Sequence, residues 1–181
     1  MMSSLFKVAT LTAVSAFLTV GCATNSPAPQ AQVINVHAVN AAGVDAAIGT
    51  ISFQDSDAGL VIQTDLKGLP AGERGFHIHE NASCEPAEKE GKMGAALAAG
   101  SHLNTNQAAN HGTPTTGHLG DLPALTVAED GSAQVTVVAP RLKLADIQGR
   151  AIMVHAGGDN YSDTPKALGG GGDRIACGVI Q

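Results

Sequence analysis

The sequence of 181 residues contains no tryptophan, and no long stretch of it has the periodicity of an amphipathic helix. Lys and Arg number only 10 against 16 Asp and Glu, and they form no basic stripe. An acidic chain without such a stripe is a poor ligand for nucleic acid, so we expect no nucleic-acid partner. Disordered tracts rich in Met or His, which would indicate a metal buffer, are also lacking.

Glycine is abundant instead, with 22 residues, and short segments alternate apolar and polar side chains. Both features favour an all-β domain with many turns. The alternation predicts strands at residues 33–39, 47–54, 60–66, 76–80, 125–128, 133–139, 151–155 and 175–180. We expect hairpins from the second and third of these strands and from the fifth and sixth. One helical turn is expected within 141–148.

Two long segments, residues 81–121 and 156–173, have little strand character. Such long loops in a compact domain are usually functional. The sequence has no internal repeat, so a single domain is expected from residue 33 to residue 181.

The first 21 residues have the pattern of an export signal. Lys7 precedes an apolar run, 8–20, that is too short for a comfortable membrane span. Cys22 follows Gly21, as in a bacterial lipoprotein signal peptide, although Thr19 stands where leucine is usual. We therefore expect residues 1–21 to be removed, Cys22 to be lipidated, and residues 22–32 to form a flexible tether. An ordinary secretory leader cut nearby is the alternative, and both predict export.

The remaining cysteines, Cys84 and Cys177, form a pair if Cys22 carries lipid. An exported protein meets an oxidising compartment, which favours a disulfide between them. The alternative is two buried free thiols.

Histidines gather in the stretch from Gly75 to Asp121, which holds five of the seven: His77, His79, His102, His111 and His118. His155 follows an apolar run near the end of another predicted strand. His77 and His79 are two residues apart on a strand, so both side chains face the same way and can chelate a metal. Six such residues with a nearby aspartate predict more than one metal ion. His37 lies apart from them and is interpreted as a half-exposed strand histidine.

Three motifs resemble the copper,zinc superoxide dismutase family, with the bacterial periplasmic branch most similar. They are Gly75-Phe76-His77-Ile78-His79, the run from Gly117 to Pro123, and the run from Gly169 to Ile180. The resemblance extends from about Val33 to Gln181. It implies an eight-stranded Greek-key β-barrel or sandwich with two long functional loops.

The resemblance also implies one copper and one zinc ion per subunit. The copper ligands would be His77, His79, His102 and His155. The zinc ligands would be His102, His111, His118 and Asp121. His102 would thus bridge both metals, and Asp159 would link a copper-ligand histidine to a zinc-ligand histidine.

The implied activity is conversion of superoxide to oxygen and hydrogen peroxide by Cu(II)/Cu(I) cycling, as antioxidant defence outside the cytoplasm. His102 would deliver a proton, and Arg174 would attract the anion. Lys92 and Lys166 are further candidates for steering, whereas Asp173 would offset part of the attraction of Arg174. A bridge from Cys84 to Cys177 would help to position Arg174.

The resemblance places the protein in the periplasm, attached to a membrane by lipid. Ala23 is not the aspartate that retains lipoproteins at the inner membrane, so the outer membrane is expected. A homodimer and a monomer both stay open, because both occur among bacterial relatives.

Other functions are possible for such residues. An exported copper or zinc buffer would use the same ligands without turnover, but it would have no need for Arg174. A β-sandwich with incidental histidines would not repeat the family's spacings. A hydrolytic zinc enzyme needs an open zinc site with an acid or base nearby, and no glutamate stands beside these histidines in that way.

Overall fold

A computed structural model of the protein describes residues 31–181. The predicted signal peptide, Cys22 and all but the end of the tether lie outside the described residues. Within residues 31–181, no helix is both long enough and apolar enough to cross a membrane.

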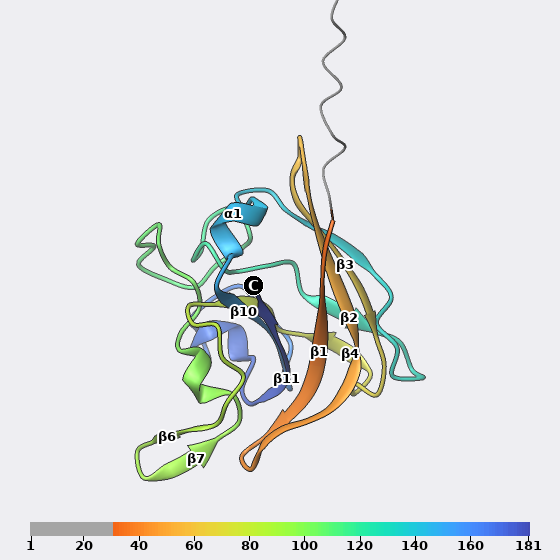
Figure 1. Ribbon diagram of the computed structural model, residues 1–181. Helices are drawn as coiled ribbons and strands as arrows, with labels where there is room; N and C mark the ends of the chain where they lie inside the picture. The colour runs from red at the N-terminus through yellow and green to blue at the C-terminus, as the bar shows by residue number, and fades with distance from the viewer. Residues whose placement is uncertain (1–30) are drawn as a thin grey trace, which may run out of the picture.

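The main element is a curled antiparallel sheet of seven strands in the order β5-β10-β11-β1-β2-β3-β9 (Figure 1). Its strands are β1 (Gln32–Asn40), β2 (Gly43–Ser56), β3 (Gly59–Leu66), β5 (Phe76–His79), β9 (Thr136–Ala139), β10 (Arg150–His155) and β11 (Arg174–Ile180). The prediction of an all-β fold is confirmed.

A two-stranded ribbon, β4 (Gly72–Arg74) with β8 (Leu125–Val127), completes the barrel. β4 and β5 are separated only by Gly75, so they count as one interrupted strand, and the barrel then has the eight strands expected. The connections from β3 to β4 and from β9 to β10 join strands that are not neighbours in the sheet. Strands distant in sequence, β3 with β9 and β1 with β11, pair instead, as in a Greek key.

The strands form where alternate side chains can be buried inside the barrel. In β3, Leu60, Ile62 and Leu66 are buried while Gln63 and Asp65 are exposed. The buried hydroxyl of Thr64 donates a hydrogen bond of 2.8 Å to the carbonyl of Ala133, so this polar group is paired inside the core. The core thereby provides a rigid support for the loops outside it.

One expectation about local structure is wrong. The turn at Asp130 and Gly131 forms, but β8 pairs with β4, and β9 pairs with β3, so the predicted hairpin of 125–128 with 133–139 does not exist. The segment 81–121, for which little strand character was expected, contains a small hairpin, β6 (Ala87–Lys89) with β7 (Lys92–Gly94), and a 3-10 turn, η1 (Leu97–Ala99). The helical turn within 141–148 is confirmed as α1 (Leu144–Ile147).

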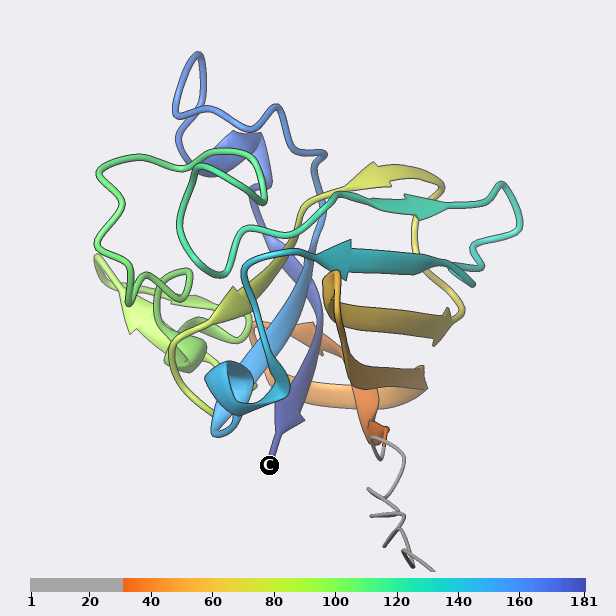
Figure 2. The ribbon, with the colours of Figure 1, turned by 90° about the horizontal axis from the view of Figure 1, so that it is seen from above.

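Both long loops lie on the same side of the barrel, as the green and blue segments of Figure 2 show. The second loop, 156–173, contains only the short 3-10 turn η2 (Leu168–Gly170). Hydrogen bonds join the two loops to each other, so segments distant in sequence form one structure over the outer face of β5 and β10.

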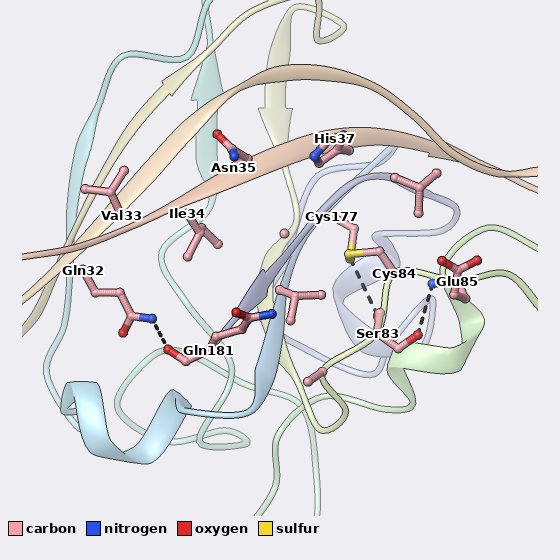
Figure 3. A pocket seen from close by; sticks show the side chains of 14 residues that line it. Gln32, Val33, Ile34, Asn35, His37, Ser83, Cys84, Glu85, Cys177 and Gln181 are labelled. Carbon is pink, nitrogen blue, oxygen red and sulfur yellow. Dashed lines mark hydrogen bonds between the residues drawn. A yellow bond between two sulfur atoms is a disulfide. The ribbon is translucent and has the colours of Figure 1, made fainter.

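A disulfide joins Cys84 in the first long loop to Cys177 in β11. It lies beside an open groove of about 670 Å³ between β1, β11 and residues 82–85 (Figure 3). His37, which also lines the groove, is half-buried, and its Nδ1 lies 3.1 Å from the carbonyl oxygen of Asp45. The disulfide prediction is confirmed, and the bond ties the loop to the strand that begins at Arg174.

Loss of the disulfide is expected to destabilise the metal-free protein. The double variant Cys84→Ser/Cys177→Ser should unfold with a free energy about 2–5 kcal/mol lower than the parent, because the bond closes a long loop in the unfolded chain. Urea unfolding of both metal-free proteins measures this difference. Reduction of the parent should lower its stability similarly, and identical unfolding curves for parent and double variant would contradict the prediction.

Candidate metal centre

The site is built on the outer face of β5. Phe76 and Ile78 point into the core, so the intervening His77 and the following His79 face outwards together, as the period of a strand requires. Both histidines are buried all the same, because the long loops cover them. The period-two prediction for this pair is confirmed.

Backbone contacts carry the first loop to this strand. The amide of Ile78 donates to the carbonyl of Gly120 at 2.9 Å, and the carbonyl of Ile78 accepts from the amide of Leu103 at 2.8 Å. The neighbouring residues, His102 and Asp121, are thereby placed opposite His79 and His77. His155 arrives from the end of β10, the strand that pairs with β5.

Four buried histidines form a first set: His77, His79, His102 and His155. Their ligating atoms lie within 4.8 Å of one another. The Nδ1 atoms of His79 and His155 contact the carbonyl oxygens of Gly100 and Gly172 at 3.0 and 3.2 Å. Their Nε2 atoms consequently face the centre of the set, where they are 3.4 Å apart. Nitrogen-only ligation of this kind suits copper(II).

A second set surrounds the carboxylate of Asp121. Its Oδ1 lies 2.9 Å from His102 Nδ1, 3.0 Å from His111 Nδ1 and 3.5 Å from His118 Nδ1. Its Oδ2 accepts hydrogen bonds from the amides of Gly112 and His118 at 3.0 and 2.8 Å, which fixes the orientation of the carboxylate. Two or three ring nitrogens with one carboxylate oxygen form a closed donor set that suits structural zinc.

The structure differs from the expected zinc set in one respect. The compact group at this end contains His77, His102, His111 and Asp121, with His77 in place of His118. However, Nε2 of His77 is hydrogen-bonded to Asp159, and His77 has only one other ring nitrogen. The one remaining nitrogen of His77 can belong to only one of the two sets, and His118 Nδ1 lies 3.5 Å from the same oxygen of Asp121.

Asp159 connects the two sets. Its Oδ2 lies 2.8 Å from His77 Nε2, and its Oδ1 lies 2.8 Å from His111 Nε2. A side chain at Gly169 would meet both partners, since an added Cβ would lie 2.1 Å from Asp159 Oδ1 and 2.8 Å from His111 Nε2. Gly169 also has a φ of +71°, so both space and backbone conformation require glycine there.

The sequence reasoning missed two residues of the second loop. Asp163 accepts hydrogen bonds of 3.0 Å from the amides of His111 and Leu168. The hydroxyl of Tyr161 accepts a hydrogen bond of 2.9 Å from the amide of Ala124. The polar character of the loop is the only signal in the sequence, because these contacts are made to backbone groups that any residue could supply.

Buried ring nitrogens without partners provide a test of whether metals fit. Nδ1 of His77, of His111 and of His118 makes no hydrogen bond among the described residues, although each atom is buried; Oδ1 of Asp121 lies 3.0 Å from His111 Nδ1 and 3.5 Å from His118 Nδ1, as an ion-pair contact without hydrogen-bond geometry. Unpaired buried polar atoms are costly and rare in folded proteins. All three belong to the two sets, so the donors present fit two metal ions that would satisfy them.

Burial sets the charge of the first set. It is the main cause that lowers the pKa of His102 to about 4 and the pKa of His155 to about 3. Burial, followed by the positive charge of Arg174, also lowers the pKa of His79 well below its ordinary value. These rings are neutral at neutral pH in the metal-free protein, so their lone pairs are available to a metal.

The carboxylates reverse this effect at His111. Burial lowers its pKa, but the two carboxylates beside the ring, those of Asp121 and Asp159, outweigh burial and raise the pKa to about 9. The pKa of each aspartate is held well below its ordinary range by its histidine partners, which outweigh the cost of burying the charge. Zinc binding at His111 would therefore release a proton.

Arg174 stands beside the first set at the start of β11. Its guanidinium donates to the carbonyls of Ala96 and Gly100 at 2.5 and 2.6 Å. Gly100 also contacts the ring of His79, so one carbonyl positions both residues. Lys92 and Asp173 line the same groove as Arg174, whereas Lys166 lines a separate hollow with Glu73 and Asp159.

The all-β barrel carries two adjacent sets of metal donors that share a histidine, and an arginine lies beside one set. This arrangement is that of a binuclear metalloprotein able to act on a small anion. Comparison with known proteins then identifies the family. The family model described as copper/zinc superoxide dismutase (SODC) matches residues 47–180.

Relatives agree over most of the chain. A superoxide dismutase [Cu-Zn] from Escherichia coli K12 is 53% identical over 82% of this chain and 87% of its own length. One from Neisseria meningitidis serogroup A is 58% identical over 74% of each chain. The structure of Cu/Zn superoxide dismutase from Brucella abortus superposes with a TM-score of 0.82 at 45% identity, covering 84% of this chain and all of that one.

The chain belongs to the copper/zinc superoxide dismutase family. It is an oxidoreductase that acts on superoxide, with copper and zinc as cofactors. The family and fold expected from the sequence motifs are confirmed.

Proposed function

We propose that copper is held by the first set and zinc by the second, on opposite sides of His102. The copper ligands are then His77, His79, His102 and His155, and the zinc ligands are His102, His111, His118 and Asp121. The observation that carries this assignment is the group of three buried Nδ1 atoms that make no hydrogen bond, those of His77, His111 and His118. Because Nδ1 of His102 lies 2.9 Å from Asp121, its Nε2 is left for the copper side.

When bound, copper supplies the one-electron oxidation and reduction by which superoxide is converted to oxygen and hydrogen peroxide. The chain supplies the remaining functions. Arg174, held by two carbonyls, presents a fixed positive charge and hydrogen-bond donors to the anion. His102 Nε2 faces the copper side and could hold the proton that the product needs whenever it is not itself bound to copper. Asp159 keeps His77 and His111 in place.

The assignment is tested by measuring superoxide dismutation by the purified protein, with copper and zinc counted on the same sample. We expect activity with about one ion of each metal per chain, as two donor sets that share one residue require. Full metal content without turnover would instead support the metal-buffer alternative.

We also propose that residues 1–21 are a lipoprotein signal peptide and that lipidated Cys22 anchors the protein in the periplasm, at the outer membrane. The apolar run 8–20, followed by Gly21 and Cys22, supports the proposal. The disulfide is consistent with it, because such bonds persist in oxidising compartments. Residues 22–32 would then act as a tether that lets the domain lie at a distance from the membrane.

The variant Cys22→Ser is expected to move the protein from the membrane fraction to the soluble periplasmic fraction, because the acceptor of the lipid is lost. Fractionation with immunodetection measures the shift. The control variant Ala23→Asp should stay membrane-bound but move to the inner membrane. Membrane association of Cys22→Ser equal to that of the parent would exclude the anchor.

A homodimer is compatible with this assignment but is not required by it. All residues of the proposed site come from one chain. Sedimentation equilibrium of the purified domain determines the oligomeric state.

A further inference from the structure

His118 is the least constrained of the proposed ligands. Every other histidine of the two sets has a hydrogen-bond partner on its ring, whereas the part of the chain that the structure describes provides none for the ring of His118. Its side chain is also 13% exposed, against 0–2% for His77, His102 and His111. The position of its Nδ1 therefore depends on how firmly its backbone is held.

Local contacts hold that backbone only in part. The amide of His118 donates to Asp121 Oδ2 at 2.8 Å, and its carbonyl accepts from the amide of Asp121 at 3.2 Å. Both contacts lie inside one turn, so they would move together with it. The preceding turn is closed by the amides of Thr116 and Gly117, which both donate to the carbonyl of Thr113 at 3.0 Å.

Arg141 supplies a contact from outside this segment. Its Nη2 donates to the carbonyl of His118 at 2.7 Å, and its Nε donates to the carbonyl of Pro114 at 2.7 Å. Arg141 comes directly after β9 and Pro140, so its backbone is part of the barrel framework. Its guanidinium is half-buried and pairs with no described carboxylate, so both interactions serve the loop backbone.

We propose that Arg141 is a positioning residue for the zinc site, which clamps the Pro114–His118 turn to the barrel and so sets the zinc affinity of the protein. The inference rests on the assignment of His118 to zinc made above. A planar guanidinium can donate to the carbonyls of Pro114 and His118 at once. A lysine ammonium at the same place keeps the charge but lacks the two fixed, separated N–H donors that this requires. After loss of the clamp, the remaining side-chain hydrogen bond among the described residues that reaches this turn from beyond 111–121 is that of 3.0 Å from Asn106 Nδ2 to the Gly117 carbonyl, and Asn106 belongs to the same long loop.

The test uses the full mature chain with Arg141→Lys and, as a second variant, Arg141→Gln. Zinc affinity is measured by competition with a chromophoric chelator, and copper affinity is measured in the same way. We expect zinc binding to weaken about tenfold, at the lower end of the effect of residues that support a metal ligand, while copper binding stays unchanged. Cobalt(II) bound in the zinc site should show weaker tetrahedral absorption bands in the variants.

Arg150→Lys is the matched control. Arg150 also donates to a backbone carbonyl, that of Glu80, and among the described residues it has no hydrogen bond to the 111–121 segment. The Arg150→Lys protein should bind zinc with the affinity of the parent. The stability of its metal-free form should fall about as much as the stability of metal-free Arg141→Lys. Thermal unfolding of the metal-free proteins measures that stability.

The proposal is overturned if Arg141→Lys keeps parental zinc affinity and an unchanged cobalt spectrum. It is also overturned if copper and zinc affinity fall equally, because the effect is then a general loss of structure. If Arg141→Lys does not fold, the zinc affinity, copper affinity and cobalt spectrum of Arg141→Gln are judged by the same two criteria. A parent protein that binds no zinc would refute the proposed function itself, a result distinct from either of these.

Discussion

Asp159→Asn is expected to weaken zinc binding about 10- to 100-fold, which is the usual effect of removing a residue that orients a metal ligand. The carboxylate receives His77 Nε2 on one oxygen and His111 Nε2 on the other, both at 2.8 Å. An asparagine has one oxygen and one amide nitrogen, so it can accept from only one of the two rings. The other ring is then free to rotate, and the metal that it holds binds less tightly.

Chelator competition at neutral pH measures this loss for zinc and copper separately. Asp163→Asn is the matched control, since Asp163 lies in the same loop and also reaches His111, but through the backbone amide and not the ring. We expect its zinc affinity to fall much less than that of Asp159→Asn. Equal affinities of parent and Asp159→Asn would show that Asp159 does not orient the ligands.

Arg174→Ala is expected to lower kcat/KM for superoxide about tenfold or more and to flatten its dependence on ionic strength. Local steering of a charged substrate raises association rates by roughly 10- to 1000-fold. The chain has a formal charge of −6, so attraction of an anion must come from local groups. Arg174 is fixed beside the copper set by its bonds to Ala96 and Gly100.

Pulse radiolysis over a range of salt concentrations measures both effects. Arg174→Lys should keep the salt dependence but lose part of the rate, because the charge stays while one of the two carbonyl bonds is lost. Asp173→Asn should have the opposite effect and raise the rate at low salt, because Asp173 lines the same groove. A salt profile of Arg174→Ala identical to that of the parent would remove Arg174 from the steering role.

The orientation of side chains was easiest to predict from the sequence within a single strand, where the period of two residues decides which side chains share a face. His77 and His79 are two residues apart on β5, so their shared face could be predicted without any tertiary information. The pairing of β8 could not be predicted, because a turn signal at Asp130 and Gly131 does not say which strand lies beside each arm. Its true neighbour, β4, is only Gly72–Arg74 and has no strand pattern of its own.

The residues of the two donor sets were predictable as a group through the family resemblance, but the contacts that support them were only partly so. Asp159 acts through its side chain on two rings, and the resemblance named it. Asp163, Tyr161 and Arg141 act on backbone amides and carbonyls across two loops. Such contacts leave no residue pattern on the partner, since every residue carries the backbone groups involved.

The most direct test of the central claim is a crystal of the metal-loaded protein measured with anomalous scattering at the copper and zinc edges. We predict one copper peak among His77, His79, His102 and His155, and one zinc peak among His102, His111, His118 and Asp121. His102 should then lie between the two peaks. A single peak, or a zinc peak ligated by His77 in place of His118, would contradict the assignment.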